Sequence, residues 1–197
     1  MPTRTLDDRT SASDPGRITL SHDKVRVLTP ELYEKRGLWG LLGMLSPEQR
    51  FWRTRHEEHL QHGDSRAALV VSIDPLLVAA YTDELDCIAM LRFPQELVQQ
   101  YSLQPGTRLL TVNLYARGTT PVADLENGPA SYRRYSNFTP LIADFVSEDR
   151  ARIERRKAAI EEPEWLRTRA LAERYLARHG ANARDGRPLH SHKPAQV

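Results

Sequence analysis

The sequence is poor in cysteine and has no long apolar segment, and each shortage excludes a class of protein. Cys87 is the single cysteine among 197 residues, so the chain has no internal disulfide and no cysteine-based zinc site. No stretch approaches about 18 uninterrupted apolar residues, the length that spans a membrane, and residues 1–30 lack the apolar segment of a secretory signal. We therefore expect a protein of the cytoplasm, a reducing compartment, that does not enter a membrane.

Signature motifs of common enzymes are also missing. The sequence contains no G-x-S-x-G nucleophile elbow, no G-x-G-x-x-G dinucleotide loop and no G-x-x-x-x-G-K-[ST] phosphate loop. Cys87 lies inside an apolar run typical of a buried strand, where a thiol is usually inert. Lysine is rare, with 4 lysines against 24 arginines, which we take as the mark of a GC-rich bacterial genome. These absences favour a protein without catalytic activity and without a cofactor.

Charge is distributed unevenly along the chain, although the net charge of +2 is small. Residues 150–197 hold 12 Arg and Lys against 6 Asp and Glu, so residues 1–149 hold the remaining 16 against 20. The basic excess therefore lies at the C-terminal end, and an anionic partner, if there is one, is expected to bind there.

Four runs rich in apolar residues, each bounded by turn residues, predict buried strands. They are 66–73, 76–82, 87–93 and 107–117. Residues 17–28, RITLSHDKVRVL, alternate polar and apolar side chains and predict two more short strands. Capping signals predict helices that begin at Pro30 and Pro47, and a shorter helix follows Pro94.

Together these elements predict an α+β fold, in which helices pack on a small, mainly antiparallel sheet and a helical extension follows. The expected divisions are a disordered tail (1–16), an α+β core domain (17–137), a helical C-terminal extension (138–180) and a disordered basic tail (181–197). Both tails are polar and contain few side chains that could be buried in a core.

Four carboxylates interrupt the most apolar part of the chain: Asp74, Asp83, Glu84 and Asp86. A cation site would need several such oxygens on a fixed frame, and their spacing matches no calcium-binding loop. Asp74 precedes a proline, and Asp83 and Glu84 fall between two predicted strands, where turns are expected. We therefore interpret these acids as turn residues and predict no metal site.

A histidine-rich run, HEEHLQH, lies on the helix that begins at Pro47. His56 and His59 are three residues apart and share a helix face, but the zinc-binding pattern H-E-x-x-H places its histidines four residues apart. Protonated imidazoles are also favoured at the C-terminal end of a helix. We interpret the run as structural. The alternative is a metal-dependent enzyme that uses His56, His59 and nearby carboxylates.

Two clusters of arginines are candidate binding surfaces. The segment SYRRYSNF interleaves aromatics and arginines that could stack on bases and contact phosphates, or simply anchor a loop. The helix predicted over 163–179 carries an apolar stripe opposite an arginine stripe, which is expected to be solvated. The candidate binding residues are Tyr132, Arg133, Arg134, Tyr135, Arg167, Arg174 and Arg178.

The sequence thus favours a non-catalytic protein that binds a macromolecule. We expect the partner to be another protein, or a second copy of the chain, bound through the C-terminal helices because one of them has an amphipathic face. The first alternative is a nucleic-acid-binding protein that uses the arginine-rich C-terminal face, and the second is the histidine-dependent metal enzyme.

Overall fold

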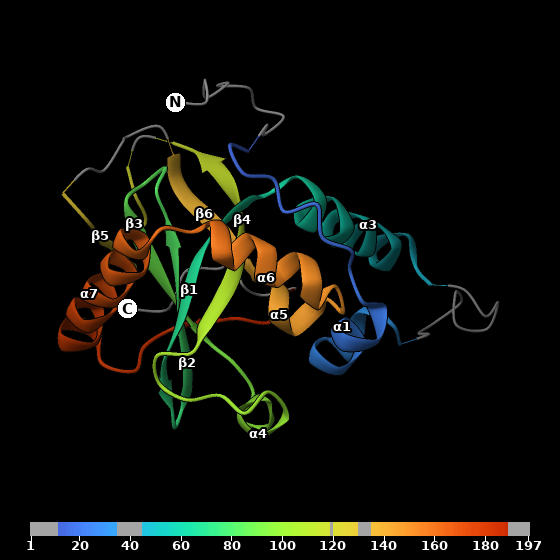
Figure 1. Cartoon of the computed structure of the whole chain (residues 1–197). Coiled ribbons are helices and arrows are strands. Elements are labelled where there is room, and N and C mark those ends of the chain that lie inside the picture. Colours follow the sequence, from blue (N-terminus) through green and yellow to red (C-terminus); the bar gives the residue numbers. More distant parts are fainter. Residues whose placement is uncertain (1–11, 35–44, 119, 130–134, 189–197) are drawn as a thin grey trace.

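The protein folds around one curled sheet of mainly antiparallel strands, with helices packed on it (Figure 1). The computed structural model describes residues 12–34, 45–118, 120–129 and 135–188. The strands follow the order β5-β3-β2-β1-β4-β6, and a short β7 pairs in parallel with β3. Their bounds are β1 Asp64–Ile73, β2 Leu76–Thr82, β3 Cys87–Arg92, β4 Arg108–Arg117, β5 Leu125–Asn127, β6 Tyr135–Ile142 and β7 Arg184–Asp185. The predicted α+β class is therefore confirmed.

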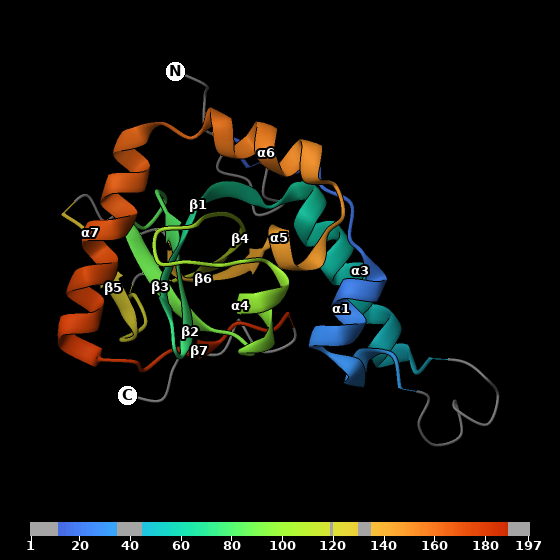
Figure 2. The ribbon, with the colours of Figure 1, turned by 60° about the horizontal axis from the view of Figure 1, so that its bottom comes forward.

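The helices surround the sheet on several sides, and the last two follow one another along adjacent sides of it (Figure 2). Their bounds are α1 His22–Leu28, the 3₁₀ helix η1 Pro30–Leu32, α3 Pro47–His62, α4 Glu96–Gln100, α5 Ala143–Val146, α6 Arg150–Ala159 and α7 Glu162–His179. The predicted capping box of α3 is confirmed, because Ser46 and Gln49 bond each other's backbone N–H groups. No helix within the described ranges is long and apolar enough to cross a membrane.

Residues 17–28 form no strand, so that part of the sequence prediction is wrong. The segment 22–28 is α1, whose first turn is capped by Ser21 Oγ as it accepts from Lys24 N. Val25 and Leu28 are the buried residues of this helix, and their spacing of three places them on one helical face. A short segment in which apolar residues fit both periods does not decide between strand and helix.

The central strands are apolar on both faces because both faces are covered. On β3, Cys87, Ala89 and Leu91 join the larger core cluster, while Ile88 and Met90 join a smaller cluster beneath α7. The smaller cluster also contains Leu171, Ala172 and Tyr175 from α7, so the apolar stripe of this helix is buried against the sheet. The prediction of a buried strand in the run 87–93 is therefore confirmed.

The described ends of the chain are joined to this core. Strand β6 pairs with β4 along its length and thus runs through position 138, where the sequence places the start of a separate extension. At the other end, Gly16 N donates to Gly63 O (3.0 Å) within the stretch 12–16 that the sequence assigns to a tail. Residues 1–11 and 189–197, which include the rest of both predicted tails, lie outside the described residues.

Arg184 of β7 links the two edges of the curled sheet. Its guanidinium forms two hydrogen bonds with Asp124, of 2.8 and 2.9 Å, just before β5. It also donates to Phe138 O of β6 (3.0 Å). Both charged side chains are 1% exposed. Residues 181–188, assigned by the sequence to a basic tail, therefore return to the sheet and connect its opposite edges.

Candidate functional site

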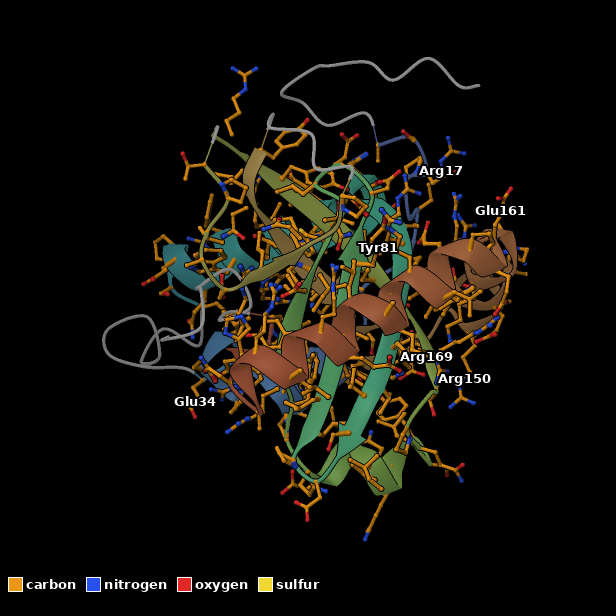
Figure 3. The ribbon with its side chains drawn as sticks, turned by 90° about the vertical axis from the view of Figure 1, so that its left-hand side faces the viewer. Arg17, Glu34, Tyr81, Arg150, Glu161 and Arg169 are labelled. Carbon is orange, nitrogen blue, oxygen red and sulfur yellow. The ribbon has the colours of Figure 1, made fainter. Side chains whose placement is uncertain are left out.

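A polar cleft of about 490 Å³ opens where α6 ends and α7 begins. Its floor comes from the start of β1 and the end of β2, and its rim from the β2–β3 turn and the N-terminal segment. Figure 3 looks toward this side, with α7 crossing the strands, Tyr81 beside it and Glu161 at its N-terminal end. The cleft is lined by Asp14, Ser65, Arg66, Tyr81, Asp83, Asp86, Arg156, Ala159, Ile160, Glu161, Pro163, Glu164 and Arg167.

The cleft opens where β1 and β2 separate. These strands are paired as far as Ala68 and Ala80, and no pairing continues beyond them toward the start of β1. The next backbone N–H, that of Ala67, instead donates to Glu164 Oε1 at 2.7 Å. A carboxylate from α7 thus replaces the missing strand partner, which explains why this end of the helix is fixed to the sheet.

Arg66 holds three carboxylates together on one side of the cleft. Its guanidinium contacts Asp83 Oδ1 at 2.7 Å, Asp64 Oδ2 at 3.0 Å and Asp14 Oδ2 at 3.2 Å. Burial opposes the charge of Arg66, but Asp64 and Asp83 outweigh it and raise its pKa. Burial also raises the pKa of Asp64 to about 6, although Arg66 and the hydroxyl of Tyr115 favour its charged form.

A second ion pair also lines the cleft. Arg167 of α7 donates to both carboxylate oxygens of Asp86, at 2.7 and 2.5 Å, and the hydroxyl of Tyr81 donates to Asp86 Oδ1 at 3.1 Å. Asp86 is buried and has a left-handed backbone with φ of 46°. Burial and then the charge of Asp86 raise the pKa of Tyr81, so its hydroxyl stays protonated and acts as a donor.

Glu164 and Ser65 are two groups of the cleft that this network leaves less satisfied. Burial raises the pKa of Glu164 to about 7, against the effect of its bond to Ala67 and of Arg66. The hydroxyl of Ser65 is buried and has no hydrogen-bond partner among the residues that the structure describes. A buried hydroxyl without a partner is costly, and here it lines a cleft that a ligand could enter.

The arginine stripe predicted on 163–179 is present, but its members do not face solvent alone. Arg174 Nε lies 3.3 Å from Glu126 Oε1, and Arg178 Nη1 lies 3.2 Å from the same oxygen. Arg167 pairs with Asp86 as described above. Arg174 and Arg178 are still 48% and 66% exposed, as a solvated stripe predicts, but the stripe also supplies the cationic partners that the buried carboxylates of Asp86 and Glu126 require.

The aromatic-basic segment is described only in part. Tyr135 begins β6, and its ring stacks on that of Tyr115 with centroids 4.8 Å apart. Tyr132, Arg133 and Arg134 lie outside the described residues. Tyr135 is therefore part of the sheet and does not join the arginines of α7 with which the sequence analysis grouped it.

The two histidines bond separate backbone carbonyls. His59 Nε2 lies 2.9 Å from Val112 O, and His56 Nε2 lies 3.2 Å from Pro188 O. Burial lowers the pKa of His59 to about 3, so this imidazole is neutral at pH 7. Among the described residues, no three His, Cys, Asp or Glu side chains are arranged to hold a metal ion. These contacts give the metal-enzyme alternative no support.

The turn interpretation of the acidic residues is correct for all four. Asp74 lies between β1 and β2, and Asp83 and Glu84 lie between β2 and β3. Asp86 lies in the same β2–β3 turn, but unlike the other three it is buried, and it is bonded to Arg167 and Tyr81. We find no match to this chain among models of known protein families, curated proteins or solved structures.

Sequence reasoning missed Ser65, Arg66 and Glu164. Arg66 begins an otherwise apolar run, and a charge at such a position signals a buried ion pair at the end of a strand. Glu164 lies in the first turn of α7, where an acid suits the helix dipole, so its position alone does not indicate a site. Nothing in the pattern indicates Ser65, since its importance depends on which hydroxyl remains without a partner after folding.

Proposed function

We propose that the protein works by binding, without catalytic chemistry of its own, and that its site is the cleft between the C-terminal helices and the ends of β1 and β2. The observation that carries the proposal is the buried, unpartnered hydroxyl of Ser65 in the wall of a cleft of about 490 Å³. That volume lies in the range of small-molecule sites, which place a few fixed polar groups around the ligand.

The charged groups around the cleft support binding in preference to catalysis. Arg66 and Arg167 already hold Asp14, Asp64, Asp83 and Asp86 in ion pairs. Carboxylates held in this way are fixed in position and are poorly available to accept a proton from a substrate. Such a network provides a rigid frame, which lowers the entropic cost of holding a ligand.

A matched pair of tryptophan substitutions tests the cleft. Ala159 lines the cleft and Ala158 is the exposed neighbour that does not line it, so Ala159→Trp fills the site and Ala158→Trp is its control. We expect a thermal-shift screen of acids, amines, sugars and nucleotides to yield a ligand that stabilises the unmodified chain and Ala158→Trp. Ligand at a hundred times its Kd adds about 2.7 kcal/mol to the free energy of unfolding.

The same screen can refute the proposal. A ligand that stabilises Ala159→Trp as much as the unmodified chain binds elsewhere. If every ligand found behaves in that way, or if none is found, the cleft is not the binding site.

The outer face of α7 supports a second proposal, that of a protein partner bound through the C-terminal helices. Leu166 is 59% exposed, beside a groove of about 810 Å³ between α7 and Pro129. An exposed leucine in a groove is a common contact for a partner protein. We expect Leu166→Asp to abolish retention of a protein partner that Ala159→Trp still binds, as measured by affinity capture on the full chain. Equal retention by both variants would contradict this proposal.

The nucleic-acid alternative receives less support from the same arginines. Arg167, Arg174 and Arg178 lie next to buried carboxylates, which reduces the cationic charge that they offer to phosphates. Binding to DNA or RNA that falls steeply with added salt would favour this alternative over the other two proposals.

A further inference from the structure

We infer that the ligand of the cleft is an organic cation, with an ammonium or guanidinium group that binds between Glu164 and Ser65. This inference rests on the proposed function of the cleft as a binding site.

The balance of charge in the cleft is acidic. Its lining contains two more carboxylates than guanidinium groups: Asp14, Asp83, Asp86, Glu161 and Glu164 against Arg66, Arg156 and Arg167. Asp64 lies directly behind Arg66 and adds a further carboxylate. This excess of negative charge would repel an anionic ligand, whereas a cationic ligand would partly neutralise it.

Two hydrogen-bond acceptors on neighbouring elements are among the groups that remain available to a ligand, and Arg156 and Glu161 line the same cleft. Glu164 uses Oε1 for Ala67 N, and within the described part of the chain its other carboxylate oxygen has no partner. Ser65 lines the same cleft, and its buried hydroxyl oxygen can accept a hydrogen bond. An ammonium or guanidinium group supplies several N–H donors at once, which suits two acceptors on neighbouring elements.

A metal ion fits this arrangement poorly. The place between Asp14, Asp64 and Asp83, where oxygens do converge, is filled by the guanidinium of Arg66. Hard cations require about six oxygens around one point, and the described residues contain no group of side chains arranged in that way. The cation that balances the remaining acidic charge is therefore expected to bring its own N–H donors.

Isothermal titration calorimetry of the full chain with four small compounds tests the inference. Butylguanidinium and butylammonium carry the expected charge, whereas butanol is neutral and butyrate is an anion of similar size. We expect the two cations to bind and the two others not to bind. Glu164→Gln should weaken cation binding at least about tenfold, equivalent to about 1.4 kcal/mol. Glu173→Gln removes an exposed carboxylate from the same helix and should leave the affinity unchanged.

The dependence of affinity on pH gives a second readout that a loss of folding would not reproduce. A cation favours charged Glu164, so binding releases a proton wherever Glu164 is protonated beforehand. Affinity should therefore rise from pH 6 to pH 8 in the unmodified chain. The charged groups that act on Glu164 are Arg66 and Asp64 from β1 and Asp83 from the β2–β3 turn. The other charged groups that line its cleft are Asp14, Asp86, Arg156, Glu161 and Arg167. If Glu164 is the coupled group, Glu164→Gln should abolish most of this rise.

Two sources could supply the cation, a free amine or the side chain of a peptide. Comparing butylguanidinium with a blocked tripeptide that contains one arginine separates them, because the tighter ligand identifies the source. Either order supports the inference.

The inference and the proposed function fail in different ways. Cation binding that Glu164→Gln leaves unchanged overturns the inference. The absence of cation binding also overturns it. Binding of butyrate or butanol that Ala159→Trp blocks would overturn it too, although this result would still support the cleft as a binding site. If Ala159→Trp blocks no compound, the proposed function fails as well.

Discussion

A single guanidinium, that of Arg66, is the shared ion-pair partner of several acids around it. It contacts Asp14, Asp64 and Asp83, and its own side chain is 8% exposed. Removing one partner of a buried ion pair commonly costs more than the pair contributes, because the remaining charge has lost both water and its counterion. At the scale of the residue, the stability of this site therefore depends on pairs and not on single groups.

Substitution of Arg66 should show this coupling. We expect Arg66→Met to lower the free energy of unfolding at pH 7 by about 3–5 kcal/mol. The double variant Arg66→Met, Asp64→Asn should lose less than the single variant, because the amide requires no counterion. Urea unfolding of both variants measures the difference, and a double variant that is less stable than Arg66→Met would contradict the coupling.

Glu164 should make stability depend on pH. Its pKa is about 7 in the folded chain and 4.5 in its ordinary state, so protonation favours the folded form. This contribution is complete below about pH 4.5 and is lost as the pH rises through 7. We therefore expect Glu164→Gln to gain about 1–2 kcal/mol relative to the unmodified chain between pH 4.5 and 7.5, a figure reduced for the partial exposure of Glu164. Denaturant unfolding across this range measures it, and parallel pH profiles would contradict it.

At the scale of the element, strands with apolar residues on both faces could be predicted and short polar ones could not. The runs that became β1 to β4 contain enough apolar residues to require burial whatever the tertiary structure. Strands β5 and β7 have three and two residues and exist because β3 is there to pair with them. The charged residues of the cleft are also brought together by long-range pairing. For this reason the sequence indicated only Asp83, Asp86 and Arg167 among them.

The link made by β7 gives a prediction at this scale. Arg184→Met leaves the buried carboxylate of Asp124 without its cation, and we expect a loss of about 3–5 kcal/mol in the free energy of unfolding. Arg187→Met is the matched control, since its ion pair with Asp185 is partly exposed and should contribute about 0–1 kcal/mol. Hydrogen exchange should also become faster in β5 and β6 of Arg184→Met alone. Equal losses in both variants would show that Arg184 does not link the edges.

For the whole molecule, the uneven charge of the sequence is largely explained by internal pairing. The C-terminal arginines 167, 174, 178 and 184 bind carboxylates at 86, 124 and 126 in the acidic part of the chain. A basic segment therefore need not indicate an anionic partner. The sequence revealed the asymmetry correctly, but only the fold shows which charges neutralise one another.

This pairing predicts that the chain does not divide near residue 149. Removing residues 150–197 would expose the apolar residues beneath α7 and leave buried acids without cations. We expect residues 1–149 alone to lack the cooperative unfolding transition and the near-ultraviolet circular dichroism of the full chain. A shortened chain that retains both would show that α6 and α7 are an independent addition.

The bond between Asp124 and Arg184 also has a consequence for biosynthesis. The two residues are separated by 60 positions, and the acid leaves the ribosome first. Until the arginine follows, Asp124 lacks the cation that makes its burial tolerable, so this edge of the sheet is expected to stay hydrated on the nascent chain. The last step of folding is then set by translation, which delivers the guanidinium after the rest of the sheet has emerged.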